Sequence, residues 1–262
     1  SFLNLFKVKQ CDVVICVLPF IGSVFLGWIL SRYKNAKFWV HIQDFEVDAI
    51  IESGLSTNEK GVKKYIFNFL FKVEKFLLNR ADIVSTISHG MLDKLESKTK
   101  KEKFYLPNWV NGDDINPCTS SIHSLYEYHP EKFKILYSGN VGEKQDWEFF
   151  LDLVDDLSKY DAVHIYVVGQ GAKFLWLKQN LINFKNVTVR EPVRFDELND
   201  LLCNADLHVL FQKKNVVDTV MPSKILGMMA SAVPSLVTGD LSSEVAIVFS
   251  KSQKEGFYEP ED

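Results

Sequence analysis

The chain has few cysteines, and they are not spaced for a shared metal or a redox pair. Its 262 residues include only Cys11, Cys16, Cys118 and Cys203. No two of them have the close spacing of zinc or redox motifs. We therefore predict buried free thiols in a reducing compartment, without a disulfide framework.

Other absences exclude whole classes of protein. No GxGxxG follows the first predicted strand, which argues against a nicotinamide dehydrogenase. No carboxylate pair of the DxD kind ends a strand, so the sequence predicts neither a metal nor another cofactor. The formal net charge of -4 argues against a nucleic-acid binder. The chain does not open on a signal peptide, and we predict a cytoplasmic location.

One apolar run is close to the length of a membrane span. Residues 11–30 carry a single charge, at Asp12. Pro19 and Gly22 divide this run into a short β-branched segment and a segment that ends in basic residues. We therefore favour a strand, a turn and a helix over a spanning helix, and we expect the strand to be buried on both faces.

The rest of the chain alternates between short apolar segments and amphipathic ones. Hydrophobic residues make up 47% of the sequence and charged residues 24%, which is enough for a full globular core. Strands alternating with helices predict α/β domains with parallel sheets. The turn-rich stretch 110–121 is the best candidate for a linker, so we place two doubly wound, Rossmann-like domains at residues 1–116 and 117–262.

Two segments of the second half place glycine, hydroxyl and lysine groups where a strand gives way to a helix. They are YSGNVGEKQ, from Tyr137 to Gln145, and VDTVMPSKILGMMASAVP, from Val217 to Pro234. Backbone N–H groups at such junctions receive phosphate. The pair therefore predicts a nucleoside diphosphate held between two loops.

These segments, together with others in the same order, resemble one family. ADIVSTIS, LPNWVN, YSGNVGEKQ, VVGQG, ADLHVLFQ, TVMPSKILGMMASAVP and EGFYEPED look like glycosyltransferase family four. HIQDFEVDA at residues 41–49 is particularly like the bacterial enzymes of colanic-acid, capsule and O-antigen assembly. The resemblance implies a GT-B fold, in which two Rossmann-like domains face across a cleft. By that template the chain looks truncated at both ends.

The resemblance implies that the first domain binds the acceptor and the second binds a nucleotide sugar. Around the diphosphate it implies donor-binding roles for Gly139, Asn140 and Gly142, with Lys144 as a cation for the leaving group. The family often has arginine where Asn140 stands. The alternative is a strand-to-helix turn with a solvated lysine.

The resemblance also assigns donor binding to the start of a second helix. Pro222, Ser223 and Lys224 open it, with Ser223 as the expected N-cap and Lys224 as a catalytic cation. An ordinary capped helix is the alternative. The family usually has a glutamate, which holds the ribose, where Gly227 stands here, and an acidic residue near Asp218 and Thr219. At these positions the chain departs from the family pattern, and its transferase activity depends on whether the missing carboxylates are needed.

Three further residues are candidates on weaker grounds. Asp44 ends a predicted strand in the first domain and is the best candidate there for touching acceptor or donor sugar. His41, in the same strand, fits a hydrogen-bonded core histidine better than a ligand. Arg194 lies where the family's base-contacting loop begins, but a surface arginine is equally consistent with its position.

The resemblance implies a retaining hexosyltransferase that depends on a nucleotide sugar and uses a lipid-linked saccharide acceptor for surface polysaccharide. The alternative is a non-catalytic protein of this fold that binds a nucleotide or a partner. Residues 61–80 form a basic amphipathic helix, which fits either peripheral contact with the inner membrane or burial against the core.

Overall fold

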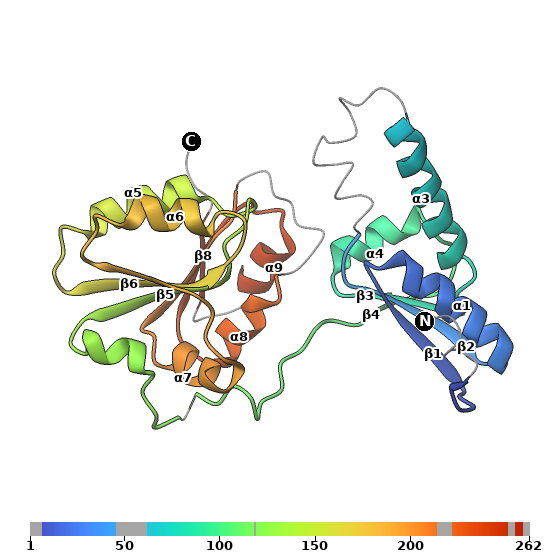
Figure 1. Ribbon diagram of the computed structural model, residues 1–262, viewed down its shortest axis with the longest axis horizontal. Helices are drawn as coiled ribbons and strands as arrows, with labels where there is room; N and C mark the ends of the chain where they lie inside the picture. Colours follow the sequence, from blue (N-terminus) through green and yellow to red (C-terminus); the bar gives the residue numbers. More distant parts are fainter. Residues whose placement is uncertain (1–6, 46–61, 118, 214–221, 251–254, 259–262) are drawn as a thin grey trace. The chain divides into compact units, whose positions relative to one another are not determined.

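The chain folds into two compact units, Ser1–Pro107 and Asn108–Asp262 (Figure 1). The sequence places the boundary after residue 116, whereas the units divide just before the predicted linker 110–121. The computed structural model describes residues 7–45, 62–117, 119–213, 222–250 and 255–258. Each unit contains one parallel sheet with helices packed against it, as the alternating sequence pattern predicts.

The first unit has a four-stranded sheet in the order β1-β2-β3-β4, with every pair parallel. Its elements are β1 (Val13–Leu18), α1 (Ile21–Lys34), β2 (Lys37–Ile42), α3 (Val62–Leu78), β3 (Ile83–Thr86), α4 (His89–Glu96) and β4 (Lys103–Tyr105). The chain alternates between strand and helix, and consecutive strands pair with one another. Each strand therefore delivers its carboxyl end to the same edge of the sheet.

The apolar run 11–30 forms a strand, a turn and a helix, as expected. β1 ends at Leu18, and α1 begins at Ile21, directly after Pro19 and Phe20. Among the residues that the structure describes, no helix has both the length and the apolar content to span a membrane. The helix packs closely on the strand, because a Cβ atom added to Gly27 would collide with the Cys16 sulfur.

The expectation that this strand is buried on both faces is wrong. Val14, Cys16 and Leu18 of β1 are buried, whereas Val13, Ile15 and Val17 are 46%, 55% and 49% exposed. A period-2 strand presents alternate side chains to opposite faces, and here the unit covers only one of these faces. The continuous apolar sequence of β1 therefore does not reflect two-sided burial within the described residues.

The thiols are partly as predicted. Cys16 is buried and unbonded to any other cysteine, and Cys11 and Cys203 are free and partly buried. Cys118 lies outside the described residues. Burial raises the pKa of the Cys16 thiol above its ordinary value, which keeps it protonated at neutral pH.

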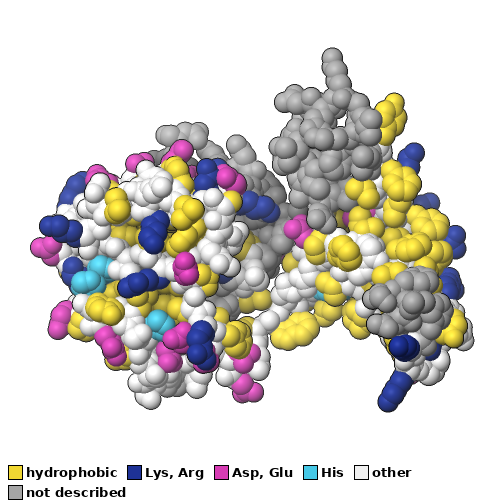
Figure 2. Space-filling model, in the orientation of Figure 1, with side chains coloured by type: hydrophobic (Ala, Val, Ile, Leu, Met, Phe, Trp, Pro, Cys, Tyr) yellow, Lys and Arg dark blue, Asp and Glu magenta, His cyan; other side chains and the backbone are white. Residues whose placement is uncertain are grey.

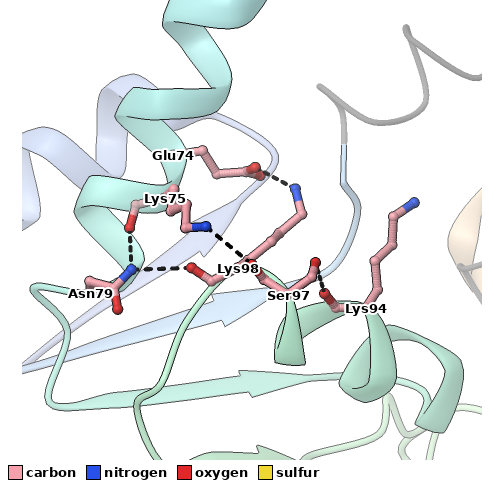
Figure 3. Close-up of polar contacts among 6 residues, drawn as sticks. All are labelled: Glu74, Lys75, Asn79, Lys94, Ser97 and Lys98. Carbon is pink, nitrogen blue, oxygen red and sulfur yellow. Dashed lines mark hydrogen bonds and ion pairs between the residues drawn. The ribbon is translucent and has the colours of Figure 1, made fainter.

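A buried ion pair joins α3 to the segment that follows α4 (Figure 3). The Lys98 ammonium lies 2.6 Å from a Glu74 carboxylate oxygen, and the two side chains are only 2% and 3% exposed. Lys75 donates to the Ser97 carbonyl, and Asn79 donates to the Lys98 carbonyl. Because removal of one partner leaves the other charge buried and uncompensated, this pair fixes α3 against the unit.

The second unit has a six-stranded sheet in the order β10-β9-β8-β5-β6-β7. Its strands are β5 (Phe133–Asn140), β6 (Val163–Gln170), β7 (Val187–Arg190), β8 (Leu207–Phe211), β9 (Ser235–Thr238) and β10 (Glu255–Tyr258). Its helices are η2 (Ser124–Tyr128), α5 (Trp147–Leu157), α6 (Phe174–Leu181), η3 (Phe195–Glu197), α7 (Leu198–Cys203), α8 (Lys224–Ala230) and α9 (Glu244–Ser250). All the strand pairs are parallel.

The strand order of the second sheet reverses direction beside β5. The chain runs outward from β5 through β6 to β7, then crosses back to β8 on the other side of β5 and continues to β10. Open α/β sheets bind ligands at the carboxyl ends of the strands where this reversal occurs. The fold therefore places a candidate site between the ends of β5 and β8.

Candidate functional site

The strands β5 and β8 separate at their carboxyl ends. β5 pairs with β6 along eight residues, from Phe133 to Asn140, but its register with β8 covers only Ile135 and Leu136. The last residues of β5 thus leave the ladder on the β8 side, where the sheet reverses direction. This divergence opens backbone groups of the strand end toward any ligand that binds there.

Glycine is required where β5 ends. Gly139 has a φ of 131°, a conformation that residues with a Cβ atom rarely adopt. On the neighbouring strand, a Cβ atom at Gly169 would collide with the Gly139 carbonyl oxygen, so β5 and β6 approach closely at this level. These two glycines therefore let the backbone of the turn come near a ligand without side chains in the way.

The loop after Gly139 is held in place over the end of β8. The Gly142 N–H donates to the Gln145 side-chain oxygen at 3.0 Å, and the Trp147 indole donates to the Gly142 carbonyl at 2.7 Å. The Asp146 N–H donates to the Phe211 carbonyl at 3.1 Å. This ladder fixes the loop that carries Lys144, whose side chain is exposed.

Lys224, the first residue of α8, reaches across to β5. Its ammonium donates to the Tyr137 hydroxyl at 2.7 Å and lies 4.2 Å from the centre of the Tyr137 ring. The Tyr137 hydroxyl in turn donates to the Asn140 carbonyl at 2.6 Å. Lys224 is therefore tied to the glycine turn through one side chain, and a Cβ atom at Gly139 would lie 3.1 Å from the lysine Cε.

Burial determines the charge of this lysine. Desolvation lowers the pKa of Lys224 from its ordinary value to about 7, and burial raises the pKa of Tyr137 well above its usual range. The hydroxyl therefore stays protonated, and the ammonium lies next to a glycine turn in a poorly solvated place. An anionic oxygen is the group that such a site stabilises best, because it compensates a costly buried cation.

The structure places Ser223 before α8 as expected, but its side chain makes no capping hydrogen bond. Ser223 has helical backbone angles, φ −58° and ψ −27°, and an N-cap normally has extended ones. Its exposed hydroxyl is therefore not used to cap the helix. Pro222 precedes it and is partly buried.

The close packing of α8 against α7 explains why a glycine stands at position 227. A Cβ atom at this position would lie 3.2 Å from the Leu202 methyl carbon of α7. Leu202 is 5% exposed and belongs to the hydrophobic cluster between α7 and the sheet. The glycine that stands in place of the family's glutamate thus lets α8 approach α7 closely.

Three predicted donor residues are not joined to this site by any described contact. Asp218 and Thr219 lie outside the described residues. Arg194 lies after β7, at the far edge of the sheet from β8, and its guanidinium bonds both carboxylate oxygens of Asp196 at 3.0 and 2.7 Å. Its side chain is 79% exposed, which fits the alternative of a surface arginine.

The predicted residues of the first domain lie at the end of β2. Asp44 follows this strand and is half-buried. His41 fits a core histidine, because its Nδ1 contacts the Ser85 hydroxyl at 2.8 Å and its Nε2 contacts the Gln43 amide nitrogen at 2.8 Å. The Gln43 amide is a donor, so Nε2 accepts and Nδ1–H donates to Ser85. Burial lowers the pKa of His41, which keeps the ring neutral.

Tyr137 is the residue that the sequence prediction missed. It stands two positions before Gly139 on the same face of β5. Gly139 has no side chain, and the Lys224 side chain lies beside this position and over the Tyr137 ring. The sequence signal that could have identified Tyr137 is an aromatic residue two places before the glycine that ends a strand. Among the described residues, no group of three or more His, Cys, Asp or Glu side chains is arranged to hold a metal ion.

No protein-family model matches the chain. The chain is 29% identical over 246 residues to WcaI of Escherichia coli (strain K12), which is named as a colanic acid biosynthesis glycosyl transferase. The match covers 89% of this chain and 59% of WcaI. The chain thus spans less than two thirds of the length of this relative.

Solved glycosyltransferases have the same fold. Sucrose-phosphate synthase from Thermosynechococcus elongatus superposes with a TM-score of 0.72 at 14% identity, over 100% of this chain and 64% of that one. Anabaena HepE in complex with UDP gives 0.69 at 13% identity, over 99% and 68%. The predicted GT-B-like α/β fold is confirmed, and the sequence resemblance to a glycosyl transferase of colanic acid biosynthesis is confirmed with it.

Proposed function

We propose that the chain carries the nucleotide-sugar site of a retaining glycosyltransferase of surface-polysaccharide synthesis. The observation that carries this proposal is the Lys224 ammonium, held beside the Gly139 turn where the second sheet reverses direction. Similarity to WcaI supports the reaction class. The HepE structures contain UDP and UDP-glucose, which supports a nucleoside diphosphate as the leaving group.

In this proposal the diphosphate of the donor lies against the turn 139–142. Lys224 stabilises the negative charge that develops as the glycosidic bond to phosphate breaks, and Lys144 adds a second cation from the loop. Asp44 stays the candidate of the first unit for contact with the acceptor or donor sugar. The acceptor in this proposal is a lipid-linked saccharide that receives a hexose with retention. The sequence has no DxD pair, so the proposal includes no metal.

Binding of the nucleotide alone tests this site. Calorimetric titration with UDP, GDP, ADP and CMP is expected to give micromolar affinity for one of the four. Lys224→Ala is expected to weaken that affinity about 10- to 100-fold, because a charge-assisted contact is lost. Lys178→Ala, on the exposed side of α6, is the matched control. Equal affinities for the two variants would refute the assigned role of Lys224.

One observation favours the alternative of a binding module without transferase activity. Gly227 packs against Leu202, so the position of the family's ribose-binding glutamate is occupied by a helix contact. Transfer of a radiolabelled sugar to a membrane lipid extract separates the two functions. Nucleotide binding without any transfer or sugar release would support the binding module and contradict the transferase.

A further inference from the structure

The connection between β4 and η2 contains an Asn-Gly pair, at Asn111 and Gly112. No other asparagine of the chain is followed by glycine. Figure 1 draws this connection as a coil, and its described residues lie in no helix or strand. Residues 111–114 are all exposed, so water and hydroxide reach the pair from solvent.

The side-chain amide of Asn111 is held in a turn. The Asp114 N–H donates to the Asn111 backbone carbonyl at 3.0 Å and closes the turn. The Asp113 N–H donates to the Asn111 side-chain oxygen at 3.3 Å, an arrangement that asparagine favours at the start of a turn. This hydrogen bond polarises the side-chain carbonyl, and the same N–H stabilises the negative oxygen that forms when a nucleophile attacks the carbon.

Gly112 leaves the backbone nitrogen that follows Asn111 open to reaction. A Cβ atom at this position would meet nothing within 4 Å, so no packed group lies on that side of the residue. Glycine also gives the backbone more rotational freedom than any other residue. The Gly112 nitrogen therefore reaches the Asn111 side-chain carbon without displacing a packed side chain.

We propose that Asn111 is a site of spontaneous deamidation. Hydroxide removes the Gly112 N–H proton, and the nitrogen attacks the Asn111 side-chain carbonyl carbon. A new C–N bond closes a cyclic imide, while the bond to the amide nitrogen breaks, and this nitrogen leaves as ammonia with a proton from water. Water then opens the ring at the side-chain carbonyl, which gives aspartate, or at the backbone carbonyl, which gives isoaspartate. No group is oxidised or reduced.

The modification changes the chain beside a fixed point of the second unit. Directly after the turn, Ile115 is 5% exposed and belongs to a hydrophobic cluster of this unit. The next residue, Asn116, donates its N–H to the Asn199 side-chain oxygen at 2.6 Å. Isoaspartate carries the main chain through its side-chain carbon, so it lengthens the connection immediately before this anchored segment.

Either product adds a carboxylate to an acidic stretch. Residues 108–117 contain Asp113 and Asp114 and no Lys or Arg. On the face of the second unit that Figure 2 shows, acidic and basic side chains are instead interspersed. The new charge therefore makes an already acidic segment more negative. This proposal does not depend on the nucleotide site.

Prolonged incubation of the folded chain at pH 7 and at pH 9 tests the proposal. Peptide mass spectrometry follows the conversion of Asn111, and an isoaspartyl methyltransferase with radiolabelled S-adenosylmethionine detects isoaspartate. We expect faster conversion at pH 9, because more of the Gly112 nitrogen is deprotonated. Gly112→Ala should slow the conversion about tenfold, since a Cβ atom hinders ring closure. The methyl group of this variant has room, so the fold is kept.

Asn180 is the internal control, because it is exposed and is followed by Leu181, whose side chain hinders the same attack. It should stay intact while Asn111 converts. Equal conversion of the two, or an intact Asn111 at pH 9, would overturn the proposal. Conversion of Asn111 in concentrated urea but not in the folded chain would also overturn it, because the turn would then protect the amide. A Gly112→Ala variant that converts at the wild-type rate would exclude attack by the Gly112 nitrogen.

Discussion

At the residue scale, Tyr137 connects the two halves of the proposed nucleotide site, the glycine turn and Lys224. Its hydroxyl accepts from Lys224 and donates to the Asn140 carbonyl, so one oxygen orients both the cation and the glycine turn. The ring also lies under the lysine at 4.2 Å. A change that removes only the hydroxyl should therefore disturb the position of Lys224 without leaving a cavity.

Tyr137→Phe is expected to lower the free energy of unfolding by about 1–2 kcal/mol and to weaken nucleotide affinity about fivefold. Urea denaturation and calorimetric titration measure the two effects. Tyr126→Phe is the matched control, because that buried hydroxyl donates to the Leu201 carbonyl at 2.7 Å. The control should lose stability and keep its affinity. An unchanged affinity in Tyr137→Phe would contradict the positioning role.

The lowered pKa of Lys224 leads us to expect that nucleotide binding depends on pH. With its pKa at about 7 in the folded protein, the ammonium of the free site loses its proton above this pH. We expect nucleotide affinity to fall between pH 7 and pH 9, by at most about tenfold per pH unit. Lys224→Met should remove this slope. A wild-type affinity that does not change over this range would contradict the assignment.

The same group predicts a pH dependence of stability. Its folded pKa is depressed below the value of 10.5, so the unfolded chain binds more protons between pH 7 and about pH 10.5. The contribution of Lys224 to stability therefore rises with pH across that window. Urea denaturation at pH 7 and pH 9 should show wild type gaining stability relative to Lys224→Met. If wild type instead loses stability relative to Lys224→Met, the pKa of Lys224 is raised on folding and not lowered.

At the element scale, two helix glycines differ sharply in their surroundings. A Cβ atom at Gly27 of α1 would collide with the Cys16 sulfur, whereas one at Gly90 of α4 would meet nothing within 4 Å. Gly27→Ala is therefore expected to destabilise the first unit by about 1–3 kcal/mol. Gly90→Ala should stabilise it by up to about 1 kcal/mol. Chemical denaturation should measure changes of opposite sign in the free energy of unfolding. Changes of the same sign in the two variants would contradict this difference in packing.

The end of α8 holds a non-glycine residue in the left-handed region. Ala232 has a φ of 56° and is exposed, so Ala232→Gly relieves backbone strain without opening a cavity. We expect a gain of about 0.5–1 kcal/mol in thermal or urea unfolding. Asn35, with a φ of 52°, should gain less on change to glycine, because asparagine tolerates this conformation. A destabilised Ala232→Gly variant would refute the strain argument.

The elements themselves were predictable because each has a local signal. Apolar runs of strand length, helical spacing and glycine or proline at the junctions predicted the strand, turn and helix of residues 11–30, as well as the turn at Gly139. The contact between Lys224 and Tyr137 joins residues 87 positions apart, and no local pattern encodes it. The exposed side of β1 and the contact of Gly227 with Leu202 depend in the same way on what packs nearby.

At the scale of the whole molecule, the second unit contains its own core and the described residues of the proposed diphosphate site. Two hydrophobic clusters lie between Ile115 and Phe249, and Tyr137, Gly139 and Lys224 are all in this unit. A unit with its own core can fold alone. We therefore expect the fragment 108–262 to bind the nucleotide within about threefold of the affinity of the full chain.

Circular dichroism and calorimetric titration of this fragment measure folding and binding separately. A folded fragment that does not bind would show that the first unit supplies part of the site, and Asp44→Ala in the full chain would then be the next variant. A folded fragment with full affinity would show that Asp44 does not contact the nucleotide, which leaves contact with the sugar or the acceptor as its role.

The buried ammonium of Lys224 has a consequence for the heat of binding. A lysine with a pKa of about 7 is only partly protonated near neutral pH, and a bound diphosphate favours its charged form. Ligand uptake then draws a proton from the buffer, so the apparent enthalpy includes the ionisation enthalpy of that buffer. Titrations in Pipes and in Tris, neither of which is a phosphate, should give the same affinity with different heats, and Lys224→Met should remove the difference.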